Sequence, residues 1–132
     1  MDNSNKKILV IEDEEPLVEL YKEILEDAGF KVKYAYSGDE GAELAAKEKF
    51  DLILLDLMLP TGSMNGTYVL SLIKGDKDRY GDPLVVVLTN LTNEAVIKDV
   101  LEQKADGFLM KTELTPEQIV KEVQNYLYSK QD

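Results

Sequence analysis

Short, almost purely apolar runs alternate with amphipathic segments along this chain, and the alternation constrains the fold more than any other feature. Lys7–Glu12, Leu52–Leu55 and Leu84–Leu88 are the clearest runs, and each has the length of a β-strand. Between the runs, apolar residues recur at three- and four-residue steps, the spacing of one helix face. Strands this apolar are buried on both faces, so we predict a parallel sheet covered by helices on each side.

The pattern predicts five strands and five helices. Gly29 should end the first helix, Pro83 precedes the fourth strand, and Pro116 opens the last helix after a Thr115 cap, with Gln118 placed for a capping box. We expect strands at residues 7–12, 32–36, 52–55, 84–88 and 107–110, and helices at 15–28, 38–48, 67–74, 93–104 and 116–128. Right-handed crossovers favour a doubly wound, flavodoxin-like α/β fold with strand order 2-1-3-4-5.

The size and composition fit one globular domain. The chain has 132 residues, of which 44% are hydrophobic, enough for a single core. We expect one domain over residues 1–132, with no output domain in this chain. The apolar runs are too short to span a membrane, the first residues are polar, and there is no cysteine, so a cytoplasmic location is expected.

The charge balance narrows the chemistry. Fifteen Lys and Arg residues against 26 Asp and Glu give a net charge of −11, which a nucleic-acid backbone would repel. Direct binding of nucleic acid is therefore not expected, and solubility is the ordinary reading of the charge. Because the chain has no histidine, it lacks the commonest general base and transition-metal ligand. Any chemistry must use carboxylates, lysines, hydroxyls and a hard cation.

Polar residues directly follow the predicted strands. Glu12 and Asp13 follow the core of the first strand, Asp56 the third, Thr89 the fourth and Lys111 the fifth. In a doubly wound sheet, ligands bind at the carboxyl ends of the strands. The first and third strands are neighbours in the expected order, so Glu12, Asp13 and Asp56 should converge on one pocket.

A pocket with three carboxylates predicts a cation and phosphoryl chemistry. The carboxylates repel one another, and oxygen ligands suit Mg²⁺, with Mn²⁺ as a substitute. Their three negative charges balance Mg²⁺ together with Lys111. Aspartate accepts phosphoryl groups covalently, and the transfer mainly requires positioning and neutralisation of charge. Each residue alone has an ordinary reading as a cap, turn or surface residue. Their placement on separate strand ends favours Asp56 as a phosphoryl acceptor.

Four stretches resemble the receiver domain of two-component response regulators. They are Ile8–Glu14, Leu54–Pro60, Val87–Thr89 and Ala105–Lys111, and the likeness covers nearly the whole chain. It implies a signalling switch, not a conventional turnover enzyme, that takes a phosphoryl group from a histidine kinase or a histidine phosphotransfer protein. It also implies an output, through a downstream protein target or a missing output domain.

The resemblance implies roles for individual residues. Glu12, Asp13 and Asp56 would surround Mg²⁺ with the main-chain carbonyl of Met58, and Lys111 would pair with a phosphoryl oxygen.

Thr89 would bond a second phosphoryl oxygen, and its inward movement would let the Phe108 ring turn inward and remodel the face of the last two strands. An ordinary half-buried ring is the competing reading of Phe108.

Three departures from the family pattern affect these expectations. Thr112 follows Lys111 where the family commonly has a cis proline, so the loop is expected to be trans or strained. Asn90 is larger than the residue usual after the switch threonine, and we expect it to alter the rate of dephosphorylation. The loop at 60–66 is about two residues longer than usual, which should change the rim of the pocket and not the acceptor chemistry.

Three other functions compete with a working receiver. A hydrolase of the haloacid dehalogenase type needs an Asp-x-Asp pair, but Leu57 and Met58 follow Asp56. A flavin mononucleotide module needs a hydroxyl- and glycine-rich phosphate loop after the first strand, where this chain has the acidic run Glu12–Glu15. A degenerate receiver that only makes protein contacts remains the alternative, and the complete acceptor set argues against it.

Overall fold

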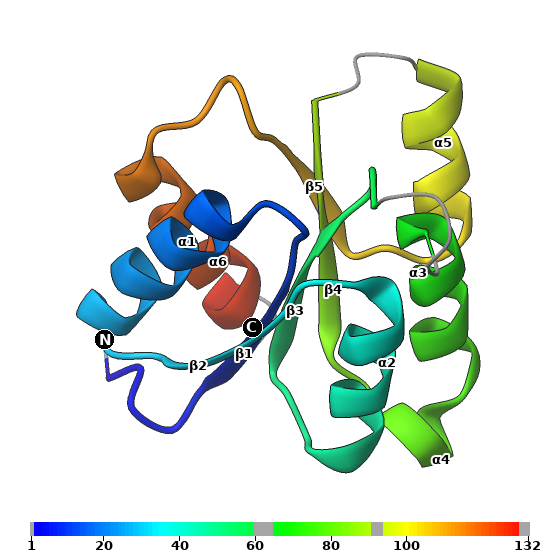
Figure 1. Ribbon diagram of the computed structural model, residues 1–132, viewed down its shortest axis with the longest axis horizontal. Coiled ribbons are helices and arrows are strands. Elements are labelled where there is room, and N and C mark those ends of the chain that lie inside the picture. Colours follow the sequence, from blue (N-terminus) through cyan, green and yellow to red (C-terminus); the bar gives the residue numbers. More distant parts are fainter. Residues whose placement is uncertain (1, 60–64, 91–93, 130–132) are drawn as a thin grey trace.

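A five-stranded parallel sheet forms the centre of the molecule (Figure 1). The computed structural model describes residues 2–59, 65–90 and 94–129, without the side chains of 94 and 96. The strand order is β2-β1-β3-β4-β5, as the sequence predicted, and every neighbouring pair is parallel. The strands are β1 (Lys7–Ile11), β2 (Lys31–Ala35), β3 (Leu52–Asp56), β4 (Leu84–Thr89) and β5 (Gly107–Met110).

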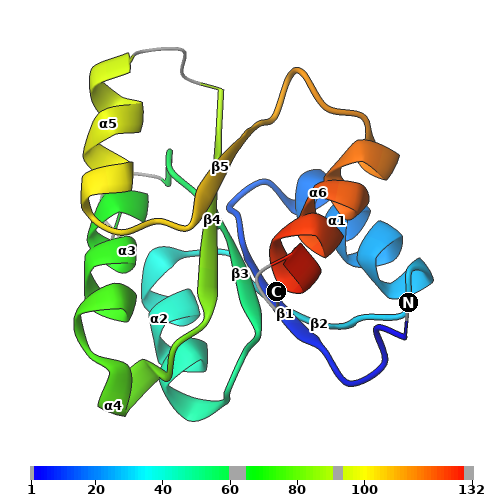
Figure 2. The same cartoon turned by 180° about the vertical axis from the view of Figure 1, so that it is seen from behind.

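Helices cover both faces of the sheet, as Figures 1 and 2 show from opposite sides. One layer consists of α1 (Glu15–Asp27) and α6 (Pro116–Ser129), and the other contains α2 (Gly38–Lys47), α3 (Gly66–Gly75), α4 (Lys77–Tyr80) and α5 (Glu94–Glu102). Each layer has its own core cluster against the sheet. The doubly wound, flavodoxin-like fold is thus confirmed.

The helix limits follow from local chemistry. In α1, Val18, Tyr21 and Leu25 are buried along one face, and each contributes roughly 2 kcal/mol through its burial. The helix ends where Gly29 takes a φ of +102°, a conformation that favours glycine.

The predicted capping box at the start of α6 is confirmed. The Gln118 amide donates to the Thr115 hydroxyl at 3.2 Å, and the Thr115 amide donates to the Gln118 side chain at 2.8 Å. The helix therefore starts where the sequence placed it.

The prediction of five helices was wrong by one short element. The single turn α4 follows α3 directly, and Asp76 caps it by accepting the Arg79 amide at 3.1 Å. Tyr80, at the end of the turn, is buried in the core beneath α2 and α3. Four residues are too few to show helical periodicity, so the sequence pattern could not indicate this element.

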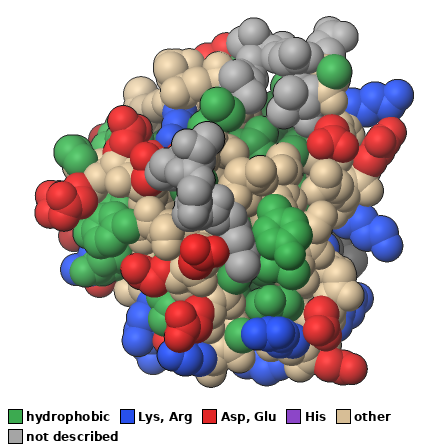
Figure 3. Space-filling view, turned by 45° about the vertical axis from the view of Figure 1, so that its right-hand side comes forward, with side chains coloured by type: hydrophobic (Ala, Val, Ile, Leu, Met, Phe, Trp, Pro, Cys, Tyr) green, Lys and Arg blue, Asp and Glu red, His purple; other side chains and the backbone are tan. Residues whose placement is uncertain are grey.

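The backbone, the helix lengths and the surface each bear on an expectation from the sequence. None of the peptide bonds in the described parts of the chain is cis, so the bond between Lys111 and Thr112 is trans. No described helix is both long and apolar enough to cross a membrane. On the face in Figure 3, acidic and basic side chains are interspersed around apolar patches.

The sheet register brings the strand ends to one level. Ile11 pairs with Leu55, so Glu12 and Asp56 leave the sheet side by side. Asp56 in turn pairs with Leu88, one residue before Thr89.

Candidate functional site

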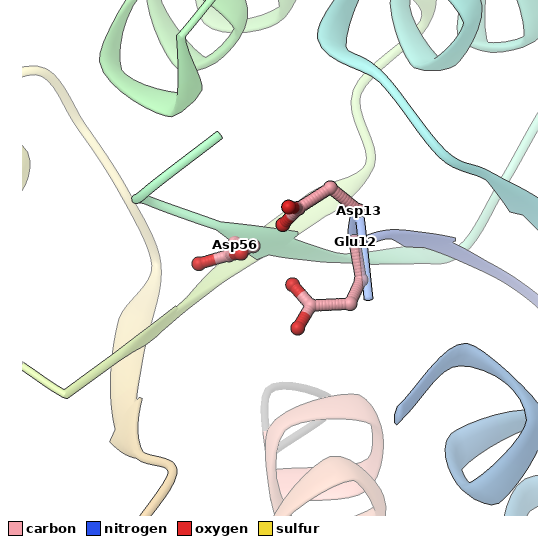
Figure 4. Close-up of side chains that lie close together, drawn as sticks. All are labelled: Glu12, Asp13 and Asp56. Atoms are coloured by element: carbon pink, nitrogen blue, oxygen red, sulfur yellow. The ribbon is translucent and has the colours of Figure 1, made fainter. Parts of the chain in front are cut away.

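Three carboxylates meet at the carboxyl edge of the sheet (Figure 4). Glu12 and Asp13 follow β1, and Asp56 ends β3. One oxygen of each lies within 4.8 Å of the others, close enough for a single ion to contact all three. The predicted convergence of these residues is confirmed.

Local contacts fix the orientation of Asp56. Its side chain is buried, and its Oδ1 accepts the main-chain amide of Met58 at 3.0 Å. Leu57 lies between Asp56 and Met58. Its amide donates to the carbonyl of Leu88 at 3.0 Å, which ties the chain after Asp56 to β4. The carboxylate is therefore held by backbone on its own loop, and that loop by the neighbouring strand.

Glu12 is the most enclosed of the three carboxylates. Its side chain is fully buried, and its Oε1 accepts a hydrogen bond from Lys111 Nζ at 2.7 Å. Its second oxygen, Oε2, has no hydrogen-bond partner among the described residues. Burial, reinforced by the nearby Asp56, raises the pKa of Glu12 to about 8, despite the contact with Lys111.

Lys111 is the cation nearest two of the three acids. Lys111 Nζ also lies 3.4 Å from Asp56 Oδ2, so it bridges two of the carboxylates. Burial alone would lower the pKa of Lys111, but the contacts with Glu12 and Asp56 raise it. Burial and the proximity of Asp56 raise the pKa of Asp13 as well. The site therefore has more negative charge than its lysine can balance.

The remaining predicted residues lie at the same edge or near it. Thr89 is buried at the end of β4, and its carbonyl accepts the Lys111 amide at 2.9 Å. Phe108 pairs with Val87, further from the edge, and is partly buried against the α2–α3–α5 core cluster. The Met58 side chain is exposed, so only its main chain takes part in the geometry around Asp56.

The structure describes Asn90 and only the end of the long loop, so it bears on these two expectations in part. Asn90 is exposed directly after Thr89, and its kinetic effect stays a prediction. Residues 60–64 of the loop lie outside the described residues, whereas Asn65 and Gly66 are described.

Sequence reasoning missed Gly66. This residue begins α3 and lies against the main chain of Asp56 and Leu57, so close that a Cβ there would be 2.4 Å from the Asp56 carbonyl oxygen. A glycine next to a capping asparagine was the only signal in the sequence, and it does not indicate what the glycine faces.

The donor set fits a hard divalent cation. Three carboxylates face one lysine, and a buried carboxylate oxygen lacks a partner among the described residues. Such groups are stabilised by an ion that takes oxygen ligands. An acidic triad of this kind is typical of the Mg²⁺ site of receiver domains.

Comparisons with known proteins agree with this reading. Residues 8–124 match the family described as the response regulator receiver domain. The chain is 33% identical over 132 residues to the DNA-binding response regulator MtrA of Mycolicibacterium smegmatis. The alignment covers all of this chain and 55% of MtrA. The chain spans about half the length of the curated relatives it matches.

Solved structures show the same fold. The chemotaxis protein CheY4 of Vibrio cholerae superposes with a TM-score of 0.83 at 27% identity, covering 92% of this chain and 98% of CheY4. A response regulator from Burkholderia pseudomallei, solved with a phosphorylated aspartic acid and a calcium ion, has a TM-score of 0.76 at 31% identity, covering 95% of this chain and 68% of its own.

Receiver domains are signalling switches of two-component systems, not conventional enzymes, and they generally imply a histidine kinase as partner. The acidic pocket of Glu12, Asp13 and Asp56 is consistent with a phosphorylation site. From its sequence match, its strand order and this pocket, the chain belongs to the response regulator receiver domain family.

Proposed function

We propose that the chain is a phosphoryl-accepting switch whose acceptor is Asp56. The observation that carries this proposal is the carboxylate cluster at the carboxyl edge of the sheet, in which Glu12 and Asp56 are buried and contact Lys111. A histidine kinase or a histidine phosphotransfer protein donates the phosphoryl group. Glu12, Asp13, Asp56 and the main-chain carbonyl of Met58 hold Mg²⁺.

The proposed transfer takes place at the carboxylate of Asp56. An Asp56 oxygen forms a bond to phosphorus while the phosphorus–nitrogen bond of the donor phosphohistidine breaks, and the imidazole nitrogen keeps the electron pair. The bond from the Met58 amide holds the other Asp56 oxygen in place. Mg²⁺ held there would supply positive charge for the phosphoryl and carboxylate oxygens. The ammonium of Lys111 moves from the carboxylates to a phosphoryl oxygen.

The switch runs through the last two strands. The Thr89 hydroxyl bonds a phosphoryl oxygen, and the movement of Thr89 changes the position of Phe108 on the neighbouring β5. Beryllofluoride with Mg²⁺, which mimics a bound phosphoryl group, should shift the amide NMR signals of Thr89, Phe108 and Lys111. Unchanged signals at these positions, with the mimic bound, would contradict the switch.

Labelling with acetyl phosphate tests the acceptor. With Mg²⁺ the protein should gain one phosphoryl group by intact-mass analysis, and EDTA or Asp56→Asn should prevent it. Asp27→Asn, which changes an exposed aspartate at the end of α1, is the matched control and should label normally. Equal labelling of the Asp56→Asn protein would reject Asp56. Absence of labelling in the unchanged protein, from acetyl phosphate and from a cognate kinase, would favour a module for protein contacts alone.

The proposed switch also needs a kinase and an output. The output is a downstream protein or a domain joined to this one, and the gene context would identify the kinase and the output. This domain itself is not expected to contact nucleic acid, given its net charge of −11. The cytoplasmic location stays a prediction.

A further inference from the structure

We infer that Gly66 is a positioning residue for the phosphoacceptor, because its missing side chain lets helix α3 pack directly on the main chain of Asp56. This inference rests on the proposed function and adds a residue to it. Gly66 is the first residue of α3 and is buried. It acts through the backbone of the loop and not by contact with the phosphoryl group.

The contact leaves no room for a side chain. A Cβ at Gly66 would lie 2.4 Å from the Asp56 carbonyl oxygen, 2.6 Å from Leu57 Cα and 2.9 Å from the Leu57 carbonyl oxygen. All three are backbone atoms, which cannot rotate away as the end of a side chain can. Any larger residue must therefore push the helix and the acceptor loop apart.

The loop is held on two sides. The Leu57 amide bonds to Leu88 of β4, and the first turn of α3 packs on the same stretch of main chain. The Asp56 carboxylate depends on this stretch, because its Oδ1 is oriented by the amide of Met58, the next residue along. A shift of the Asp56–Leu57 backbone would move both the carboxylate and the carbonyl of Met58.

The helix start itself is well anchored. Asn65 caps α3, since its Oδ1 accepts the Tyr68 amide at 2.9 Å and the Thr67 hydroxyl at 2.6 Å. The φ of Gly66 is not in the left-handed region, so the glycine is required for the close approach and not for its backbone conformation.

The same helix offers a matched control. Gly75, its last residue, has nothing within 4 Å of the position of a Cβ. Gly66→Ala and Gly75→Ala therefore make the same chemical change at the two ends of one helix. Only the first should disturb the acceptor.

The rate of labelling by acetyl phosphate with Mg²⁺ tests the inference. We expect Gly66→Ala to reduce the rate by about 10-fold to 100-fold, because small displacements of reacting groups slow reactions by factors of this size. Gly75→Ala should label at the normal rate. A normal rate for Gly66→Ala would overturn the inference. Failure of the unchanged protein and of Gly75→Ala to label would instead reject the proposed function.

A purely structural effect must be separated from positioning. Val123→Ala removes a buried side chain of α6, in the other helix layer, and destabilises the fold without touching the acceptor loop. Rates are compared per folded protein, with the folded fraction taken from urea unfolding. If the loss of rate in Gly66→Ala merely follows its unfolded fraction, as in Val123→Ala, the glycine is structural and the inference fails.

Should Gly66→Ala not fold, the cap gives a second route. Asn65→Ala loosens the first turn of α3 without adding an atom, and we expect it to slow labelling several-fold, whereas Asn65→Ser keeps a cap and should restore the rate. Equal, normal rates for both variants would overturn the inference.

Discussion

Charged side chains are balanced at one edge of the sheet and unbalanced at the other. At the amino edge, Lys74 and Asp106 form an ion pair of 2.6 Å with side chains only 12% and 18% exposed. Lys74 also donates to the Pro83 carbonyl at 2.9 Å, and Asp106 accepts the Val85 amide at 2.8 Å. There one acid meets one base, and both have further partners.

At the carboxyl edge the charges do not balance. Lys111 contacts Glu12 and Asp56 of the three carboxylates, and a buried oxygen of Glu12 has no partner within the described part of the chain. A balanced pair leaves no charge uncompensated, whereas a surplus of enclosed carboxylate costs stability unless a cation joins it. The functional site is therefore marked by an imbalance of charge, and not by the enclosure of charge alone.

The largest effect on stability is expected from the balanced edge. Lys74→Ala leaves the partly buried carboxylate of Asp106 without its cation, which should lower the free energy of unfolding by about 2 kcal/mol. Urea unfolding measures the loss. Labelling per folded molecule should stay normal, because the pair is at the opposite edge from Asp56. A loss below about 1 kcal/mol would mean that the pair contributes little.

At the carboxyl edge, the removal of a charge should raise the stability of the metal-free protein instead of lowering it. Asp13→Asn removes one repelling charge, so the metal-free protein should become more stable, while its affinity for Mg²⁺ should fall by at least about 100-fold. Urea unfolding without metal and calorimetric titration with Mg²⁺ check the two parts. A less stable metal-free variant with unchanged affinity would show that the carboxylate is structural.

The raised pKa of Glu12 predicts how the stability of the metal-free protein depends on pH. Its pKa in the folded protein is raised to about 8 from an ordinary value of 4.5, so the folded state holds the proton more tightly than the unfolded chain. The stabilisation is complete below the ordinary value and is lost as the pH rises through about 8. Without metal, the free energy of unfolding should fall by at least about 1 kcal/mol over this range.

Glu12→Gln is the matched control for that dependence. It should flatten the loss of stability between mildly acidic and mildly basic pH, and Mg²⁺ should weaken the loss in the unchanged protein, because the ion favours the ionised carboxylate. An equally steep loss in the Gln variant would assign the pH dependence to other groups.

The smallest effect is expected from an exposed pair. Lys47 and Glu43 form an ion pair of 2.9 Å on the surface of α2, with both side chains 66% exposed. Lys47→Ala should lower the free energy of unfolding by only about 0.3 kcal/mol, and salt should remove the difference. A loss several times larger would mean that exposure is a poor guide to the strength of pairs in this protein.

The sequence predicted one edge far better than the other. Glu12, Asp56 and Lys111 could be placed because each follows an apolar run, and strand ends of a parallel sheet meet at one edge. The pair of Lys74 and Asp106 was not predicted, since neither residue follows a strand and their meeting depends on how α3 packs.

The same limit explains the other omissions. The turn α4 is too short for periodicity, and the role inferred for Gly66 depends on a contact between segments. Local pattern indicates the strands and the polar residues at their ends, whereas close approaches of backbone arise only when the helices dock. The roles of Thr89 and Phe108 depend on a second conformation, which a pattern in the sequence does not describe.

The position of the phosphoryl group on the chain decides whether Asp56 is the acceptor. The protein is labelled with acetyl phosphate and Mg²⁺, the acyl phosphate is reduced with borohydride to fix its position, and the peptides are sequenced by mass spectrometry. We expect a single modified residue, Asp56, and none in the Asp56→Asn protein. Modification of Asp13 or of an exposed carboxylate in place of Asp56 would contradict it.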